Sequence, residues 1–395
     1  MAGQLAIPNA YDGREQALVK HTLLESYLQK LFMIVGMATG KGKRADLCYI
    51  DCFAGPWGDD SEAMESTSIA VSLRVLDACR QALESRGVDV NIRALYVEED
   101  AHAYGRLSNY LNSNAPSGIQ TRAVHGDFVA HRDEILAWTG TEAFAFFFID
   151  PKGWKDVRIE VLRKLLKRPR SEFLINFMYD FINRTMSMND WQPDMKELLG
   201  RSIDLVGLVP EERERKILRT YRQSLKECVP SSSAQYPARS AYVRVMDPKR
   251  ERPKYHLVYL TSHPRGITEF MKISEQVDLV QKQVRAVKRN SDREDRTGVA
   301  DMFGAETLIE PNAGHASASD VDGYWLDYLD AGIRLIRQDE FAAILEETNW
   351  FPGDLQASLV RLMQKGAVRN LDGKGKRQRT PLHLSANGER LERIR

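Results

Sequence analysis

The sequence predicts an α/β fold in which a mostly parallel sheet carries helices on both faces. Residues 144–149 are six consecutive apolar residues, which fits a strand buried on both faces at the centre of such a sheet. An earlier apolar run, residues 45–51, ends at Asp51 and is followed by the turn Phe53-Ala54-Gly55-Pro56 and a helix-like run over residues 68–83. A strand, a turn of small residues and a helix form a ligand pocket at the carboxyl ends of the strands in doubly wound sheets.

Length, composition and charge limit the class of protein. At 395 residues the chain is long enough for about two or three compact units, and 43% hydrophobic with 28% charged residues is ordinary for a soluble globular protein. The net charge of +1 predicts no global affinity for nucleic acid, so any such binding requires a local patch. No apolar run approaches the roughly eighteen residues of a membrane span, and no signal segment follows Met1.

The four cysteines, Cys48, Cys52, Cys79 and Cys228, are too few and too scattered for a disulfide framework, which favours a reducing, cytoplasmic location. Cys48 and Cys52 are close together on one predicted strand, but no second pair matches them. We therefore expect a cytoplasmic protein that has no metal site and no contact with a membrane.

The second and third predicted strands end in residues suited to a nucleoside. Residues 92–97 lead into Glu98, whose carboxylate offers only acceptors and can bind both hydroxyls of a ribose. The alternative is that the acids at this point stabilise the start of a helix. Residues 120–124 lead to Asp127 and Phe128, which can contact the amino group and the ring of an adenine. The alternative for Asp127 is a helix N-cap.

The fourth strand is followed by the strongest local signal, Asp150-Pro151-Lys152-Gly153-Trp154. The carboxylate of Asp150 and the carbonyl of Pro151 can accept the two N–H groups of a planar amine. An exposed Trp154 can stack on the ring that carries the amine. The alternative is an Asp-Pro turn with a tryptophan in the core.

The remaining segments complete the first predicted domain, residues 1–290. Residues 13–36 are interpreted as a helix beside the first strand, with Lys20 as a surface residue. Asn176 lies within the fifth strand, residues 172–177, and needs a partner there. Helices in an insertion of about 185–235 are expected to cap the pocket mouth. The short connection between the strands 241–246 and 254–261 predicts an antiparallel hairpin at the end of the sheet.

The C-terminal part reads as a separate nucleic-acid-binding domain. A linker over 291–322 precedes two helices, a basic loop and a strand, and this order in residues 323–395 predicts a winged helix. Residues 361–395 hold ten Lys and Arg against three acids, and such a local surplus is typical of nucleic-acid binding. The alternative is a winged helix for dimerisation or partner docking. The phosphate-binding candidates in the basic loop are Lys374, Lys376, Arg377 and Arg379.

The catalytic half resembles the Rossmann-like class I S-adenosylmethionine-dependent methyltransferases, and more closely the three-Cys-motif partner (TcmP) family. The resemblance spans about residues 15–395 and is carried by residues 20–28, 49–56, 148–154 and 175–177, by Arg184 and by residues 257–264. It implies S-adenosylmethionine as cofactor and a three-Cys-motif protein as partner. The Phe-Ala-Gly-x-Gly turn that is usual in such enzymes appears here with its last glycine displaced to Gly58. The Asp-Pro-Pro-aromatic motif of amino-methylating enzymes appears with its aromatic residue shifted by one position, to Trp154.

Two functional hypotheses follow. The first is a methyltransferase acting on a nucleic-acid base, with the cofactor across Asp51, Gly55, Glu98 and Asp127, and Asp150 orienting the acceptor nitrogen. The second is a non-catalytic cofactor- or nucleic-acid-binding partner subunit, which the displaced glycine favours. A dinucleotide oxidoreductase and a kinase-like enzyme are disfavoured, because neither a Gly-x-Gly-x-x-Gly nor a Gly-Lys-Ser/Thr loop follows the first strand.

Overall fold

The chain divides into two compact units, Met1–Ser262 and His263–Arg395. The computed structural model describes residues 8, 11, 14–40, 42–55, 67–185, 192–230, 236–297, 316–373 and 380–394. The helix α9 (Pro264–Thr297) belongs with the second unit, whereas the sequence places residues up to 290 in the first domain. Within the predicted linker, residues 298–315 lie outside the described part of the chain.

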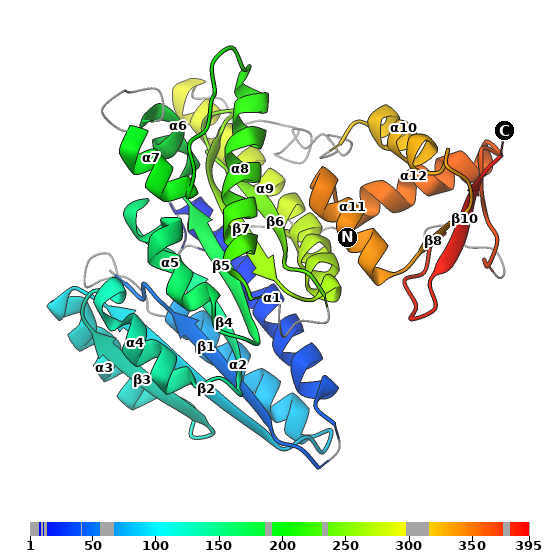
Figure 1. The fold of residues 1–395 in the computed structure, drawn as a ribbon. Helices are drawn as coiled ribbons and strands as arrows, with labels where there is room; N and C mark the ends of the chain where they lie inside the picture. The colour runs from blue at the N-terminus through cyan, green and yellow to red at the C-terminus, as the bar shows by residue number, and fades with distance from the viewer. Residues whose placement is uncertain are drawn as a thin grey trace. The chain divides into compact units, whose positions relative to one another are not determined.

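The first unit is built on a seven-stranded sheet with the order β3-β2-β1-β4-β5-β7-β6 (Figure 1). Strands β1 to β5 are parallel, and β7 runs antiparallel to both β5 and β6. This confirms the predicted terminal hairpin and makes the fold Rossmann-like. The strand order reverses between β1 and β4, and such a switch point is where doubly wound sheets bind ligands. The strands are β1 (Ala45–Asp51), β2 (Val90–Glu98), β3 (Ile119–His125), β4 (Phe144–Ile149), β5 (Ser171–Phe177), β6 (Arg239–Met246) and β7 (Pro253–Thr261).

The central strand β4 is buried along its whole length, as its apolar run predicts. Its side chains alternate between the two faces of the sheet, so that Phe147 and Ile149 join one core while Phe146 packs on Tyr27 and Tyr49 of the other. Both cores therefore depend on this strand, and its carboxyl end lies at the centre of the sheet edge.

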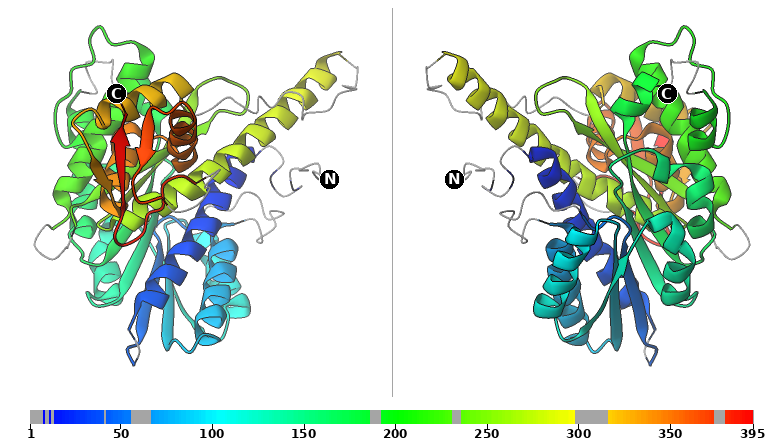
Figure 2. Two further views of the ribbon diagram at one scale, coloured as in Figure 1. Left: turned by 90° about the vertical axis from the view of Figure 1, so that its right-hand side faces the viewer. Right: turned by 90° about the vertical axis from the view of Figure 1, so that its left-hand side faces the viewer.

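One face of the sheet is covered by α1 (Glu15–Ala38) and α2 (Ser68–Glu84), which pack side by side (Figure 2). The Tyr27 hydroxyl of α1 donates to Glu172 of β5 at 3.1 Å, and Ser72 of α2 shares a 2.9 Å hydrogen bond with Tyr96 of β2. Nearer the edge of the sheet, α3 (Ala101–Asn114) packs against β3. The contacts of Tyr27 tie α1 to the middle of the sheet.

The other core is formed by α4 (Phe128–Thr139), α5 (Ile159–Leu166), α7 (Gln192–Leu199) and α8 (Pro210–Cys228). The expected helical cap over the pocket mouth is wrong for the described residues, because α8 packs against α5, β6 and β7 instead. Apolar side chains such as Tyr221 and Leu225 are fully buried there. Burial of this stripe outweighs the dense charge of the helix, most of which stays on its solvent face, while the buried Glu214 pairs with Arg244 and His256. The short α6 (Tyr179–Thr185) contacts β7.

The second unit consists of α9, α10 (Ala318–Tyr328), β8 (Arg334–Ile336), α11 (Gln338–Thr348), α12 (Pro352–Gln364), β9 (Val368–Asn370) and β10 (Glu389–Arg393). The strands form an antiparallel sheet with the order β8-β10-β9. Trp325 is fully buried in this unit and its indole N–H donates to the Leu355 carbonyl at 3.2 Å. The four basic candidates in the loop 374–379 lie outside the described residues.

Candidate functional site

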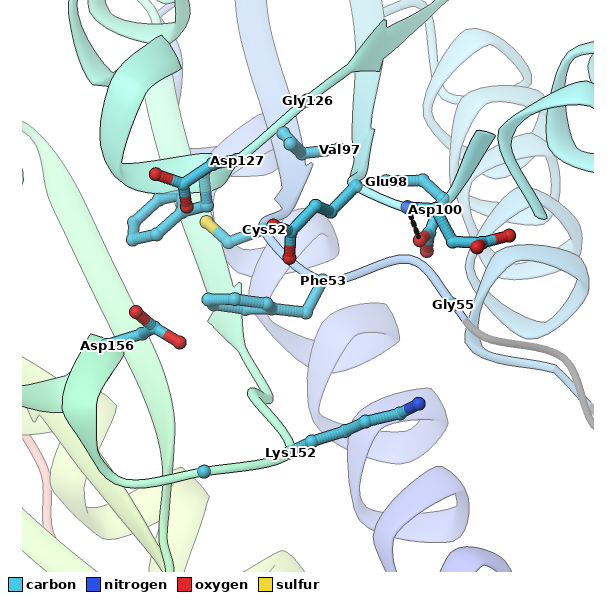
Figure 3. Close-up of a pocket in the computed structure, with 13 residues that line it drawn as sticks. Cys52, Phe53, Gly55, Val97, Glu98, Asp100, Gly126, Asp127, Lys152 and Asp156 are labelled. Carbon is cyan, nitrogen blue, oxygen red and sulfur yellow. Dashed lines mark hydrogen bonds between the residues drawn. The ribbon is translucent and has the colours of Figure 1, made fainter. Parts of the chain in front are cut away.

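A cavity of about 210 Å³ opens at the carboxyl ends of β1, β2 and β3 (Figure 3). The structure brings together, in its wall, five of the seven residues that the sequence assigns to a cofactor. These are Phe53, Gly55, Glu98, Asp127 and Phe128, and the wall also includes Lys152, Gly153 and Asp156, which follow β4. The cavity therefore lies beside the switch point of the sheet, where the topology predicts it.

Glu98 is the last residue of β2 and its side chain is directed into the cavity, toward the ring of Phe53 (Figure 3). The residue is only 5% exposed, and one carboxylate oxygen accepts a 2.7 Å hydrogen bond from the Asp100 backbone N–H. Burial raises the pKa of Glu98, while the Lys152 amine opposes that rise. A partly desolvated acceptor of this kind is suited to a ligand that brings hydroxyl donors.

Asp127 and Phe128 stand at the start of α4. Asp127 is the N-cap of this helix and accepts hydrogen bonds from the Val129 and Ala130 backbone N–H groups at 3.1 and 3.3 Å. Phe128 is buried, and its ring centre lies 5.1 Å from that of Phe53. Asp127 is therefore a helix N-cap, as the alternative interpretation expects, and it also lines the cavity; its contact with an adenine stays a prediction.

The turn after β3 requires a glycine. Gly126 has φ +139, and a Cβ atom at this position would lie 2.4 Å from Nε2 of His131. The Gly126 backbone N–H donates to the Glu98 carbonyl at 2.9 Å, which joins the ends of β2 and β3. The glycine thus holds Asp127 and Glu98 at neighbouring points of the cavity wall.

Asp51 and Ala54 do not line the cavity; they lie beneath its wall. Asp51 is fully buried and accepts hydrogen bonds from the Ser68 hydroxyl at 2.8 Å and the Phe53 backbone N–H at 3.2 Å. Burial raises the pKa of Asp51 to about 7. The Ala54 N–H donates to the Val97 carbonyl at 2.8 Å. These contacts fix the positions of the turn after β1 and of the start of α2. Asp51 and Ala54 therefore support the cavity wall without lining the cavity.

Asp150, which directly follows β4, belongs to a second polar group beside the cavity. Its carboxylate forms an ion pair with Lys20 of α1, and it accepts a 2.6 Å hydrogen bond from the Asn176 side-chain amide. The side chains of Lys20 and Asp150 are 17% and 16% exposed. The Asn176 amide oxygen is buried without a hydrogen bond to any described residue. The sequence marks Asn176 as a polar residue that needs a partner, but nothing in it pairs Lys20 with Asp150.

Trp154 is not exposed, so the expectation that it stacks on a substrate from the surface is wrong. The residue is 4% exposed and belongs to the core that includes Phe128 and Val157. Pro151 is also buried. The turn after Asp150 folds the tryptophan inward, because burying a large ring is strongly favourable. Lys152 and Gly153, between these two residues, reach the cavity instead.

Two further features of the described residues bear on the site. No group of three or more His, Cys, Asp or Glu side chains among them is arranged to hold a metal ion. In the same part of the chain, no helix is both long and apolar enough to cross a membrane.

Comparison with known proteins gives only distant similarity. No family model matches the chain, and no curated protein matches it. Among solved structures, a DUF574 family protein from Streptomyces avermitilis is 10% identical, with a TM-score of 0.31 over 65% of this chain and 92% of that one. A dimethyladenosine transferase from Plasmodium falciparum is 11% identical, with a TM-score of 0.29 over 86% of this chain and 96% of that one. At these TM-scores the fold rests on the sheet order and strand directions of the chain itself.

Proposed function

We propose that this protein is an S-adenosylmethionine-dependent methyltransferase that acts on a nitrogen of a nucleic-acid base. The observation that carries the proposal is the cavity at the switch point of the sheet, into which the buried carboxylate of Glu98 projects, with the Asp150 group beside it. A ligand with ribose hydroxyls and a reactive group pointing toward β4 matches this distribution of acceptors.

The cavity residues fit the proposed cofactor in chemistry. Glu98 would accept the ribose hydroxyls, Asp127 and Phe128 would contact the adenine, and the Phe53 to Gly55 turn would lie along the methionine portion. The volume of about 210 Å³ is below the roughly 300–1,000 Å³ typical of ligand sites. Residues 56–66, which follow Gly55 in the sequence, lie outside the described part of the chain. The cofactor supplies an activated methyl group on its sulfonium.

The acceptor group would be held by Asp150 and Asn176. Methyl transfer to nitrogen depends mainly on alignment, which supplies about 7–11 kcal/mol in well-oriented reactions. In this proposal Asp150 and the buried, unpaired amide oxygen of Asn176 supply two acceptors for the N–H groups of a planar amine, with the Pro151 carbonyl as a third. Lys20 and the Asn176 amide group hold the carboxylate of Asp150 in one orientation.

The C-terminal unit supports a role in binding nucleic acid. Its order of α11, α12, β9 and β10, with a basic loop between the last two strands, agrees with the proposal of a winged helix. In this proposal Lys374, Lys376, Arg377 and Arg379 contact phosphates, and a three-Cys-motif protein is the partner that the family resemblance implies.

The decisive experiment measures cofactor binding and methyl transfer separately. A ligand at a hundred times its dissociation constant stabilises the folded state by about 2.7 kcal/mol, so S-adenosylmethionine should raise the melting temperature. Transfer of a tritiated methyl group to mixed DNA, RNA and the partner protein then tests the reaction. Absence of any thermal shift across millimolar cofactor would rule out the enzyme.

A non-catalytic cofactor- or nucleic-acid-binding subunit is the second candidate, and one observation favours it. The carboxylate of Asp150 is already engaged by Lys20 and Asn176, so that a substrate must compete for its oxygens. A cofactor-binding subunit predicts a thermal shift with S-adenosylmethionine but no methyl transfer to nucleic acid or to the partner protein, and a subunit that binds only nucleic acid predicts neither. The same two measurements therefore separate the candidates.

A further inference from the structure

An open, basic cleft of about 600 Å³ lies on the helical face of the first unit and shares no lining residue with the cavity at the strand ends. Its cationic lining comes from α4 and from the length of α5, including both caps of that helix. The five cationic residues are Arg132, Arg158, Arg163, Lys164 and Lys167. None of them has a role in the site described above.

The charge of this cleft is unbalanced. Its lining contains two acids, Glu160 and Glu197, so the five cations leave a surplus of three on a protein whose formal net charge is only +1. The one apolar lining residue is Val161. A protein-binding surface would need several aromatic or aliphatic anchors at its centre, and this lining offers no aromatic residue and only the single valine. The composition favours a polyanion as the ligand.

Two of the cations are available for a ligand. Arg158 pairs with Glu197 at 2.6 Å, Lys164 pairs with Asp133, and Arg132 donates to the backbone carbonyls of Val129 and Val161. The other two cations of the lining differ from these three in their side-chain contacts. The side chains of Arg163 and Lys167 are exposed and make no hydrogen bond or ion pair with any described residue.

The spacing of these side chains suits a nucleic-acid strand. Arg163 and Lys167 are four residues apart at the end of α5, so they project from the same side at about 6 Å along the helix axis. The whole basic run from Arg158 to Lys167 covers about 14 Å at the α-helical rise of about 1.5 Å per residue. A nucleic-acid strand advances about 3.4 Å per phosphate, so this length matches about four nucleotides.

We propose that this cleft binds the phosphate groups of a nucleic-acid strand, with Arg163 and Lys167 as the direct contacts. The role of the cleft in holding a methylation substrate rests on the proposed function, whereas phosphate binding does not. Arg163 can engage one phosphate with two N–H groups, and Lys167 acts as a point charge on a phosphate about two positions along the strand. These contacts carry no sequence information, so the cleft fixes the register of the strand and leaves base selection to the catalytic site.

The test uses the full chain and labelled single-stranded RNA and DNA oligonucleotides, with binding followed by fluorescence anisotropy at several salt concentrations. The double variant Arg163→Gln/Lys167→Gln should bind at least about tenfold more weakly and lower the salt slope by about two. The matched control, Lys43→Gln/Arg44→Gln, removes two exposed cations from the turn before β1 and should change neither quantity. Glu160→Gln should strengthen binding.

Equal weakening in both double variants, or an unchanged salt slope in Arg163→Gln/Lys167→Gln, would overturn the proposal. The proposal would also be overturned if the wild-type protein bound polyglutamate but neither RNA nor DNA, and if Arg163→Gln/Lys167→Gln lost this binding. In that case the cleft would bind an acidic protein segment. Melting temperatures with S-adenosylmethionine are measured on the same proteins. If S-adenosylmethionine raises the melting temperature of none of these proteins, the proposed methyltransferase function is refuted. The anisotropy result on phosphate binding by the cleft is not affected by that outcome.

Discussion

Lys20 of α1 and Asp150 at the end of β4 form an ion pair between residues that are 130 positions apart in the chain. Both side chains are mostly buried, so the pair replaces a large part of their hydration. Removing one partner from such a pair leaves an uncompensated charge, which costs more than the pair itself contributes. The pair lies where the acceptor group of a methyl transfer is proposed to bind, and we interpret it as a device that orients Asp150.

Replacement of Asp150 tests its role in the reaction. Asp150→Ala should abolish methyl transfer and leave the dissociation constant of S-adenosylmethionine within a few fold, because Asp150 does not line the cofactor cavity. Tritium transfer and cofactor titration measure the two quantities. Equal activity in both proteins would remove Asp150 from the mechanism.

Lys20 should act through Asp150 and not through the cofactor. Lys20→Met should lower kcat about 100-fold, the effect of a small misplacement of a reacting group, with no change in cofactor affinity. Lys20→Arg, which keeps the charge, should recover part of the rate. Steady-state kinetics with saturating cofactor give the comparison, and a fully active Lys20→Met protein that folds normally would contradict the interpretation.

Glu98 should contribute to cofactor affinity alone. Glu98→Gln should weaken binding of S-adenosylmethionine about 10- to 100-fold, because a hydrogen bond to a charged group contributes about 1.5–3 kcal/mol. Isothermal titration calorimetry measures the change. Glu99→Gln is the matched control, since Glu99 is exposed at the same cavity, and it should bind the cofactor almost normally.

Asp51 should make stability depend on pH. Its pKa is about 7 in the folded protein against an ordinary value of 3.8, so between these values the folded state holds a proton that the unfolded state has lost. The free energy of unfolding therefore falls as pH rises through this window, by up to about 4 kcal/mol from this group. Asp51→Asn, which cannot ionise, should lack this fall.

Urea denaturation at several pH values from 5 to 8 measures the effect of Asp51 as a difference between wild type and variant. The free energy of unfolding of Asp51→Asn, relative to that of wild type, should rise with pH and should level off above about pH 7. Asp89→Asn, at an exposed position, serves as the control and should show no such trend. A pH-independent difference for Asp51→Asn would show that the carboxyl is ionised throughout.

Trp154 should prove to be a structural residue. Trp154→Ala should destabilise the protein by about 3–5 kcal/mol, the usual cost of truncating a buried aromatic side chain. Trp154→Phe, which keeps an apolar ring, should cost less and retain kcat. Denaturation and transfer assays on the same samples check both points, and a stable Trp154→Phe protein without activity would restore a catalytic role.

Much of the cofactor cavity could be predicted from the sequence. Glu98 directly follows an apolar run and Asp127 lies two residues after the third strand, and the carboxyl ends of parallel strands meet at one edge of a sheet. Lys20 could not be predicted in the same way, because a basic residue on an amphipathic helix carries no sign of which strand end it will meet. The position of α8 was also open, since an apolar stripe shows that a helix is buried but not what it covers.

The order of chain segments, the central apolar strand, the antiparallel hairpin and the acids at the strand ends were determined by the sequence alone, since local periodicity and turn residues decide them. Tertiary structure decided the rest. Whether Asp51 lies in the wall or beneath it, whether Trp154 faces solvent or core, and which cation meets Asp150 all depend on packing between segments far apart in the chain. Burial then changes the chemistry of these groups, because a charge taken out of water loses its hydration.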